Sequence, residues 1–130
     1  MALAGADLLL YPTAIGWAEE DDQAEQDRQL DAWTTVQRSH AIANGLPVLS
    51  CNRTGFEPDP SKLTGGIHFW GHSFICGPQG EMLAQANAIS PGILVTTLDM
   101  QRVESVRRTW PYLRDRRIDA YGDLDKRLLD

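Results

Sequence analysis

The segment 23–44 constrains the fold most, because its pattern is that of one long amphipathic helix. Its larger apolar residues recur at close to the 3.6-residue helical period: Leu30, Trp33, Val36 and Ala41. The acidic residues just before it, ending at Asp22, are suited to cap its start, and Gly45 with Pro47 is suited to end it. A helix over 23–44 is therefore predicted.

Two short apolar runs flank this helix. The first, Asp7–Tyr11, is closed by Pro12 and has the composition of a strand buried on both faces. The second, Val48–Asn52, follows the helix after a turn. Strand, helix and strand in this order predict a βαβ unit with a parallel pair and a right-handed crossover, and hence an α/β fold.

The rest of the chain, from residue 53 onwards, is predicted to form a loop, an antiparallel sheet and a helix. Gly and Pro residues among charges favour a surface loop over 53–66, long enough to suggest binding. Apolar runs separated by turn signals then predict an antiparallel meander: 67–70, 72–76, 81–86 and 93–98. Asp99 is expected to cap a helix that ends near Arg108, with Val103 and Val106 on one face, before a charged tail.

Length and composition limit the function. The 130 residues fit one domain over 1–130, and 42% hydrophobic residues favour a folded core. A net charge of −6 makes nucleic acid a poor partner. The longest apolar run, 8–11, is too short for a membrane helix, so no membrane partner and a cytoplasmic location are expected. No motif indicates a cofactor.

Cysteines and histidines offer two weaker hypotheses. Cys51 and Cys76 are expected to be reduced, buried thiols, whereas a Cys–His hydrolase built on Cys51 is the less favoured alternative. His68 and His72 have the spacing of a helical metal site, but their neighbours favour extended chain. On a strand the two imidazoles would lie about 13 Å apart at 3.3 Å per residue, so no metal site is predicted.

Charged clusters have ordinary explanations too. The group 19–22 either attracts a cationic ligand or forms a solvated helix start, and the second explanation is preferred. The segment 114–117 is interpreted as an ion-paired surface rather than an anion site. Residue patterns alone therefore show no complete catalytic set.

Four sequence blocks nevertheless resemble a known family. They are Tyr11-Pro12-Thr13-Ala14-Ile15-Gly16-Trp17, the stretch 50–55, the stretch 69–81 and the stretch 113–121. In this order they are similar to the carbon-nitrogen hydrolases of the nitrilase superfamily, and most similar to the branch that acts on N-carbamoylputrescine. The resemblance implies the C-terminal half of a four-layer α-β-β-α sandwich. The βαβ unit, the meander and a C-terminal helix and tail would then form part of that sandwich.

The resemblance also implies site residues and their limits. Such enzymes use a Glu base, a Lys and a Cys nucleophile, all expected before the matched region, so no catalytic residue is assigned here and Cys51 and Cys76 do not inherit that role. Thr13, Ala14 and Ile15 are similar to the wall beside the carbamoyl group. Trp17 and the residues after it are similar to the end that meets the distal amine. Many relatives have an acidic or polar residue directly after the position of Trp17, where this chain has Ala18, so Glu19 or Glu20 is expected to substitute for it. Asn52 and Arg53 match a strand-end motif and are expected to hold loops.

The expected ligand is an N-carbamoyl amine or a diamine. Without the reactive groups, the chain is expected to be inactive alone. Apolar surface left open by the missing half predicts a homo-oligomer. The alternative is an oligomeric small-ligand-binding or interaction module derived from the same fold.

Overall fold

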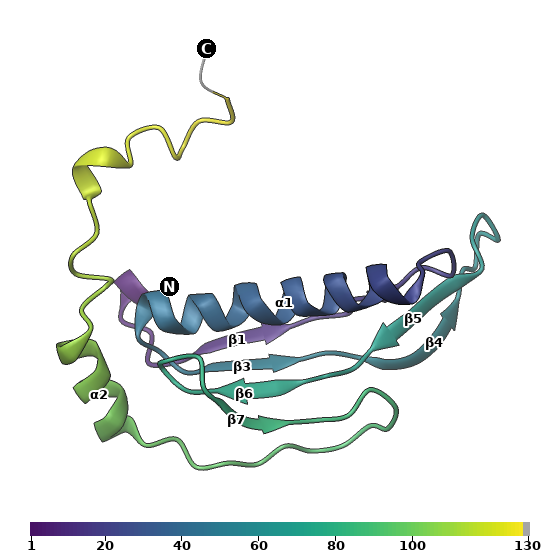
Figure 1. The fold of residues 1–130 in the computed structure, drawn as a ribbon, viewed down its shortest axis with the longest axis horizontal. Helices are drawn as coiled ribbons and strands as arrows, with labels where there is room; N and C mark the ends of the chain where they lie inside the picture. Colours follow the sequence, from purple (N-terminus) through teal and green to yellow (C-terminus); the bar gives the residue numbers. More distant parts are fainter. Residues whose placement is uncertain (129–130) are drawn as a thin grey trace.

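The computed structural model describes residues 1–128, and its central feature is the expected strand–helix–strand unit (Figure 1). Strand β1 covers Leu9–Pro12, helix α1 covers Gln23–Asn44 and strand β3 covers Val48–Cys51. β1 and β3 pair in parallel, with Leu9 opposite Val48. Asp22 caps α1 by accepting a hydrogen bond from the Glu25 backbone N–H, and Gly45 ends it in the left-handed conformation at φ 60°. The helix, its caps and the parallel pair are thus confirmed.

Helix α1 covers one face of the strands with a stripe that differs from the predicted one. Gln37 and Ala41 are buried and Trp33 packs on the core, but Val36 is 49% exposed. The stripe therefore runs through Trp33, Gln37 and Ala41, at intervals of four residues. The expectation for Val36 was wrong because a polar residue one position later occupies the inner face.

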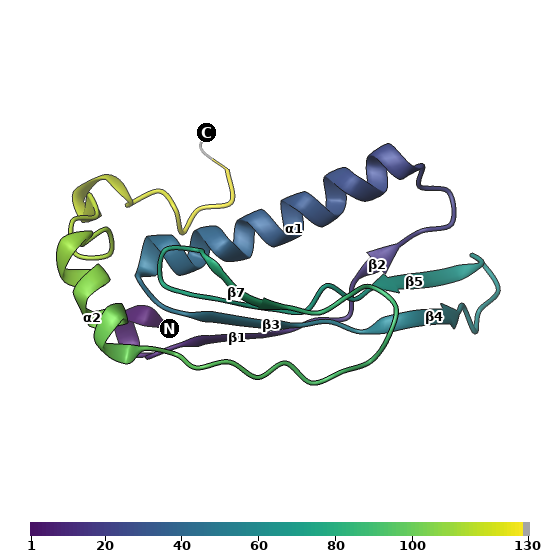
Figure 2. The ribbon, with the colours of Figure 1, turned by 60° about the horizontal axis from the view of Figure 1, so that its bottom comes forward.

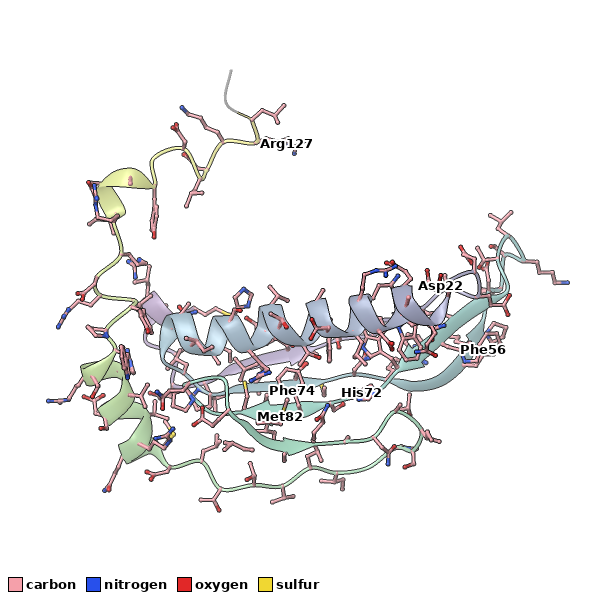
Figure 3. The ribbon with its side chains drawn as sticks, in the orientation of Figure 1. Asp22, Phe56, His72, Phe74, Met82 and Arg127 are labelled. Carbon is pink, nitrogen blue, oxygen red and sulfur yellow. The ribbon has the colours of Figure 1, made fainter. Side chains whose placement is uncertain are left out.

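Two sheets form, and their strand orders differ. The first sheet has the order β1-β3-β6-β7 and the second the order β2-β5-β4. The remaining strands are Gly16–Trp17 (β2), Thr54–Pro58 (β4), Gly66–Trp70 (β5), Phe74–Cys76 (β6) and Met82–Gln85 (β7). The second sheet lies beyond the start of α1, where Asp22 and Phe56 are at the same end of the molecule (Figures 2 and 3).

Two predictions about this half are corrected. The segment 53–66, expected to be a surface loop, is strand over 54–58 and loop over 59–65, because β4 pairs antiparallel with β5 along five residue pairs and makes the segment part of a hairpin. The four-stranded meander does not form as expected. β5 belongs to the second sheet, β6 and β7 form a hairpin in the first, and 93–98 pairs with no strand of the described chain.

The strand predicted to be buried on both faces is covered on one only. Leu9 is 5% exposed beneath α1, whereas Leu10, which points to the opposite face, is 61% exposed. The apolar run indicated a strand correctly, but its outer face is open in this chain.

Helix α2, Met100–Thr109, closes one end of the first sheet. Asp99 caps it through the Arg102 backbone N–H, and Val103 and Val106 are buried as predicted. Short 3-10 turns form at Ala2–Ala4 and Ile118–Ala120, and the chain after α2 leads away from the sheets (Figure 1). Neither α1 nor α2, the long helices within 1–128, has the length and apolar character needed to cross a bilayer.

Candidate functional site

The candidate site lies at the junction of the two sheets. This junction consists of three short segments, 13–15, 52–53 and 71–73. These segments interrupt β1–β2, β3–β4 and β5–β6. β1 and β3 are neighbours in the first sheet, but β5 separates their continuations β2 and β4 in the second. The chain therefore diverges just past the carboxyl ends of two parallel strands, which is where open α/β sheets bind ligands.

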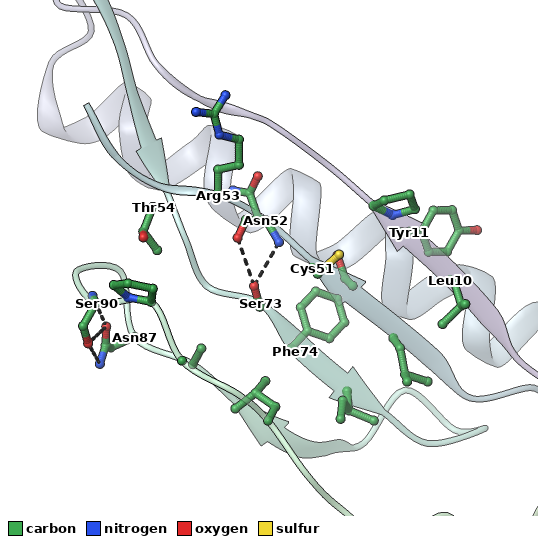
Figure 4. Close-up of a pocket in the computed structure, with 18 residues that line it drawn as sticks. Leu10, Tyr11, Cys51, Asn52, Arg53, Thr54, Ser73, Phe74, Asn87 and Ser90 are labelled. Atoms are coloured by element: carbon green, nitrogen blue, oxygen red, sulfur yellow. Dashed lines mark hydrogen bonds between the residues drawn. The ribbon is translucent and has the colours of Figure 1, made fainter. Parts of the chain in front are cut away.

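Hydrogen bonds from Asn52 tie all three segments together. Its Oδ1 accepts from the Ile15 backbone N–H at 2.9 Å and lies 3.1 Å from Thr13 Oγ1. Its Nδ2 donates to the Ile15 carbonyl at 2.9 Å and the Gly71 carbonyl at 3.2 Å. The Asn52 backbone N–H donates to Ser73 Oγ at 2.9 Å (Figure 4). The expectation that Asn52 holds loops is confirmed.

The crossing from β5 to β6 is conformationally strained. Gly71 and His72 both have positive φ, at 62° and 53°. A left-handed histidine is uncommon, and such backbone conformations persist only where their surroundings impose them. Two hydrogen bonds provide those restraints: Asn52 Nδ2 donates to the Gly71 carbonyl, and the His72 N–H donates to the Asn87 carbonyl at 3.3 Å.

A pocket of about 610 Å³ opens beside this junction (Figure 4). It lies on the face of the first sheet opposite α1, and both strand ends and the segment after β7 line it. Its polar lining residues are Ser50 and Cys51 in β3, Asn52, Arg53 and Ser73 in the junction, Thr54 at the start of β4, and Asn87 and Ser90 on the far side. The pocket is thus apolar with a few convergent hydrogen-bonding groups, as small-molecule sites usually are.

The predicted wall residues surround the junction but do not share this pocket. Thr13 is half-buried, and its hydroxyl proton is shared between the Cys51 carbonyl, 2.9 Å from Oγ1, and Asn52 Oδ1. Ala14 instead lines a separate hollow, together with Arg53 and Phe69. Ile15 is 37% exposed, and its backbone rather than its side chain is held by Asn52.

The residues predicted for the distal end gather at the start of α1. Trp17 donates from Nε1 to the Gln26 carbonyl at 3.1 Å and packs on Trp70, with 5.5 Å between ring centroids. Glu19 joins Trp17 in lining a small hollow, and its carboxylate lies against Gly65. Glu20 is exposed.

The neighbouring aspartates are used by the fold. Asp21 accepts from the Ala18 backbone N–H at 3.0 Å, and Asp22 caps α1. Half of the acidic group 19–22 therefore serves the local structure.

The two cysteines differ in environment. Cys76 is buried as expected, and burial raises the pKa of its thiol. Cys51 is exposed, contrary to expectation, because it is the last residue of β3 on the face that α1 does not cover. Each of the three histidines lies on another segment: the ring of His40 is hydrogen-bonded to the Tyr11 hydroxyl at 2.8 Å, and the ring of His68 lies against that of Phe56 at a tilt of 39°. Residues 1–128 contain no group of three His, Cys, Asp or Glu residues arranged to hold a metal.

Sequence reasoning missed one junction residue, Ser73, and two pocket residues, Asn87 and Ser90. Ser73 stands inside an apolar run that was interpreted as one strand from 72. The usable signal was Gly71, because a glycine between two apolar runs is typical of a backbone change of direction.

Comparison with known proteins identifies the family. The carbon-nitrogen hydrolase family model matches residues 1–108, and the chain therefore belongs to this family. It is 43% identical over 126 residues to an N-carbamoylputrescine amidase of Arabidopsis thaliana and 38% identical over 124 residues to a citrullinase of Francisella tularensis. These matches include 93% and 95% of this chain but 40% and 41% of the two relatives, so the chain spans about two fifths of their length.

Solved structures agree on the fold. A carbon-nitrogen hydrolase from Helicobacter pylori matches 99% of this chain with a TM-score of 0.95 and 55% identity, over 44% of its own length. An amidase from a Nesterenkonia species of the nitrilase superfamily matches 95% of the chain with a TM-score of 0.63 and 27% identity, over 36% of its length. The α/β fold of this superfamily and the resemblance stated from the sequence are thus confirmed.

Proposed function

We propose that this chain supplies the substrate-side wall of a pocket in which a carbon-nitrogen hydrolase acts on N-carbamoyl amines. The observation that carries the proposal is the convergence of polar groups from 13–15, Asn52 and 71–73 at the carboxyl ends of β1 and β3. Two relatives are named for N-carbamoylputrescine and citrulline. Both compounds end in a carbamoylated amine and differ at the other end, so the shared chemistry defines the substrate class.

The proposed substrate wall has two ends and lies beside the 610 Å³ pocket, whose lining does not include 13–15. Thr13, Ala14 and Ile15 form the wall beside the carbamoyl group, because amides need donors and acceptors fixed in place and this segment is held on both sides by Asn52. Trp17, Glu19 and Glu20 meet the distal amine, since the Glu19 carboxylate lines the same hollow as the Trp17 indole, Glu20 follows it in the chain, and negative charge beside an aromatic ring attracts a cation. The carboxylate of Glu19 supplies the negative charge that Ala18 lacks.

The reactive groups are proposed to lie outside these residues. We place the Glu, Lys and Cys that the resemblance implies in the part of the relatives that this chain does not match. A pocket wall without nucleophile and base provides weak binding and no covalent catalysis. The isolated chain of residues 1–130 is therefore proposed to be inactive.

Association is part of the proposal. The face of the first sheet opposite α1 presents Leu10, 61% exposed, and Cys51 around an apolar pocket. Exposed apolar surface of this kind favours burial between protein molecules. We propose a homo-oligomer that buries this face, with the cytoplasm as its location.

The test uses the purified 130-residue chain. It is incubated with N-carbamoylputrescine while ammonia release is measured, and the same ligand is titrated while backbone NMR shifts are followed. Saturable shifts at 13–17 without ammonia release are expected. Robust ammonia release would overturn the assignment of the reactive groups elsewhere, and an absence of saturable shifts would overturn the proposed wall.

A thermal-shift series with diamines separates the second candidate, a binding module that uses the acidic start of α1. Its observation is the hollow formed by Trp17, Glu19 and Gln26. Stabilisation by diamines but not by N-carbamoyl amines favours that module. Stabilisation by N-carbamoyl amines favours the hydrolase wall.

A further inference from the structure

The side chain of Asn52 occupies the gap that opens between β1 and β3 at the junction. Up to Pro12 and Cys51 the two strands are directly paired. Past this point β5 enters between their continuations, so Ile15 has lost β3 as a neighbour and pairs with no strand residue. Its backbone N–H and C=O both turn to the Asn52 amide, each at 2.9 Å. The side-chain amide thus takes the place of a strand neighbour for one residue.

Three of the four hydrogen-bonding positions of this amide are occupied, and the fourth faces the Thr13 hydroxyl, whose single proton is within reach of both Asn52 Oδ1 and the Cys51 carbonyl. A primary amide offers two N–H donors and two acceptor lone pairs. Oδ1 faces the Ile15 N–H and the Thr13 hydroxyl, and Nδ2 donates to the carbonyls of Ile15 and Gly71. Aspartate keeps the acceptors but has no N–H to donate, and alanine has neither. The residue at this position is therefore tied to the conformation of both segments.

We propose that Asn52 is a positioning residue that fixes 13–15 as the wall of the carbamoyl end and so determines ligand affinity. This inference rests on the proposed function. It assigns Asn52 no contact with the reacting atoms. Its effect passes through the Ile15 backbone, which is ordered by Asn52 while the Ile15 side chain remains 37% exposed. Removal of the amide frees the wall and leaves the core under α1 unchanged.

The first measurement is amide hydrogen exchange by NMR in the 130-residue chain, with Asn52→Ala and Asn52→Asp compared with the unsubstituted protein. The Ile15 amide is expected to exchange at least tenfold faster in Asn52→Ala, relative to the amide of buried Ala41 in α1, which reports global unfolding. Asn52→Asp keeps the acceptor for the Ile15 N–H and is expected to protect it more than alanine does. Asn44→Ala, which removes an exposed side-chain bond within α1, is the matched control and should leave the Ile15 ratio unchanged.

The second measurement is titration of each variant with N-carbamoylputrescine, followed by the shifts of 13–17. An apparent Kd at least tenfold weaker in Asn52→Ala, with an unchanged Kd in Asn44→Ala, supports the proposal. An unchanged Ile15 exchange ratio or an unchanged Kd in Asn52→Ala overturns it. If Asn52→Ala does not fold, Asn52→Asp is used in its place: it loses the bonds to the Ile15 and Gly71 carbonyls but keeps the acceptor for the Ile15 N–H, so an unchanged Kd in this variant overturns the proposal.

The two proposals fail in different ways. An unsubstituted chain without saturable shifts overturns the proposed function and the affinity role of Asn52 with it. The exchange ratio then still decides whether Asn52 orders the segment 13–15. Saturable binding with an unchanged ratio overturns the role of Asn52 alone.

Discussion

At the scale of single residues, the interface under α1 leaves more buried polar atoms without hydrogen-bond partners than the junction does. Three polar side-chain atoms are buried there without a hydrogen-bond partner: Gln37 Oε1, Ser50 Oγ and Trp70 Nε1. A buried polar atom without a partner loses its hydration and gains nothing in return. The packing of Trp33 against Trp70 and Phe74 stabilises the interface in spite of this loss.

Gln37→Leu is predicted to stabilise the protein. Gln37 is 5% exposed, its Nε2 donates only to the Trp33 carbonyl one turn earlier, and its Oε1 has no partner. Leucine has similar volume and removes the desolvated oxygen, so the free energy of unfolding should rise by about 1–2 kcal/mol. Urea denaturation measures the change. Gln23→Leu, at the exposed first residue of α1, should alter it by less than about 0.5 kcal/mol.

Gly16→Ala is predicted to detach β2. A Cβ at Gly16 would lie 2.0 Å from the His68 carbonyl oxygen, which belongs to the backbone of β5 and has no freedom to move aside. Such overpacking should cost about 1–3 kcal/mol in unfolding free energy and change the fluorescence of Trp17 as it leaves Trp70. Gly92→Ala is the matched control, because nothing lies within 4 Å of a Cβ at Gly92. Equal effects of the two substitutions would contradict the prediction.

At the scale of elements, the turn between β6 and β7 is held by both helices. Arg38 of α1 donates to the Gly80 carbonyl at 2.7 Å, and Arg102 of α2 donates to Gln79 at 2.8 Å and pairs with Glu81 at 3.0 Å. The turn therefore joins α1, α2 and the first sheet, and its bonds to Arg102 help to hold α2 against the sheet.

Glu81 should make this attachment depend on pH. Burial acts to raise the pKa of Glu81, but hydrogen bonds from its own backbone N–H, from Arg102 and from Gln79 outweigh burial and hold the pKa below its ordinary 4.5. The ionised form is thus favoured by folding, so its contribution is present above pH 4.5 and is lost as pH falls through the lower folded pKa. Urea denaturation between pH 3 and 7 should show this loss. Glu81→Gln should flatten the profile in that window, and an unchanged profile would contradict the role given to Glu81.

Sequence patterns predicted the elements that depend on local rules. α1, its caps, the parallel strands and α2 follow from periodicity, Asp22, Gly45 and Asp99, and all were found. The β4–β5 hairpin was missed, because Gly and Pro near 55–66 have the composition of a loop while the pairing partner lies a turn away. The junction needed knowledge of which strands are neighbours, and that information is tertiary rather than local. Only the position of Asn52 at a strand end was visible in advance.

At the scale of the whole molecule, one face of the first sheet is covered by α1 and the other is open. The adjacent residues Leu9 and Leu10 show this difference, because Leu9 is 5% exposed and Leu10 is 61% exposed. The solved hydrolase from Helicobacter pylori, which shares the fold closely, has more than half of its chain beyond the matched part. This open face is the surface that the proposed homo-oligomer would bury.

Leu10→Glu should reduce self-association if the proposed homo-oligomer uses this face. A charge placed in an apolar contact would have to be desolvated, which weakens assembly. Sedimentation velocity should show a larger monomer fraction, corresponding to a dissociation constant at least tenfold higher. The far-ultraviolet circular dichroism should be unchanged. Leu63→Glu is the control, because Leu63 is 87% exposed at the tip of the β4–β5 hairpin, away from this face. A monomeric unsubstituted chain, or equal effects of both substitutions, would contradict the prediction.

The segment 93–98 lies extended beside the first sheet without pairing, and Ile93 and Val95 are 91% and 86% exposed (Figure 2). Alternating β-branched side chains with unpaired backbone groups form a template for strand addition. At high concentration, the purified chain should be prone to fibrillar aggregation nucleated there, and lysine at positions 93 and 95 would act as a gatekeeper against it.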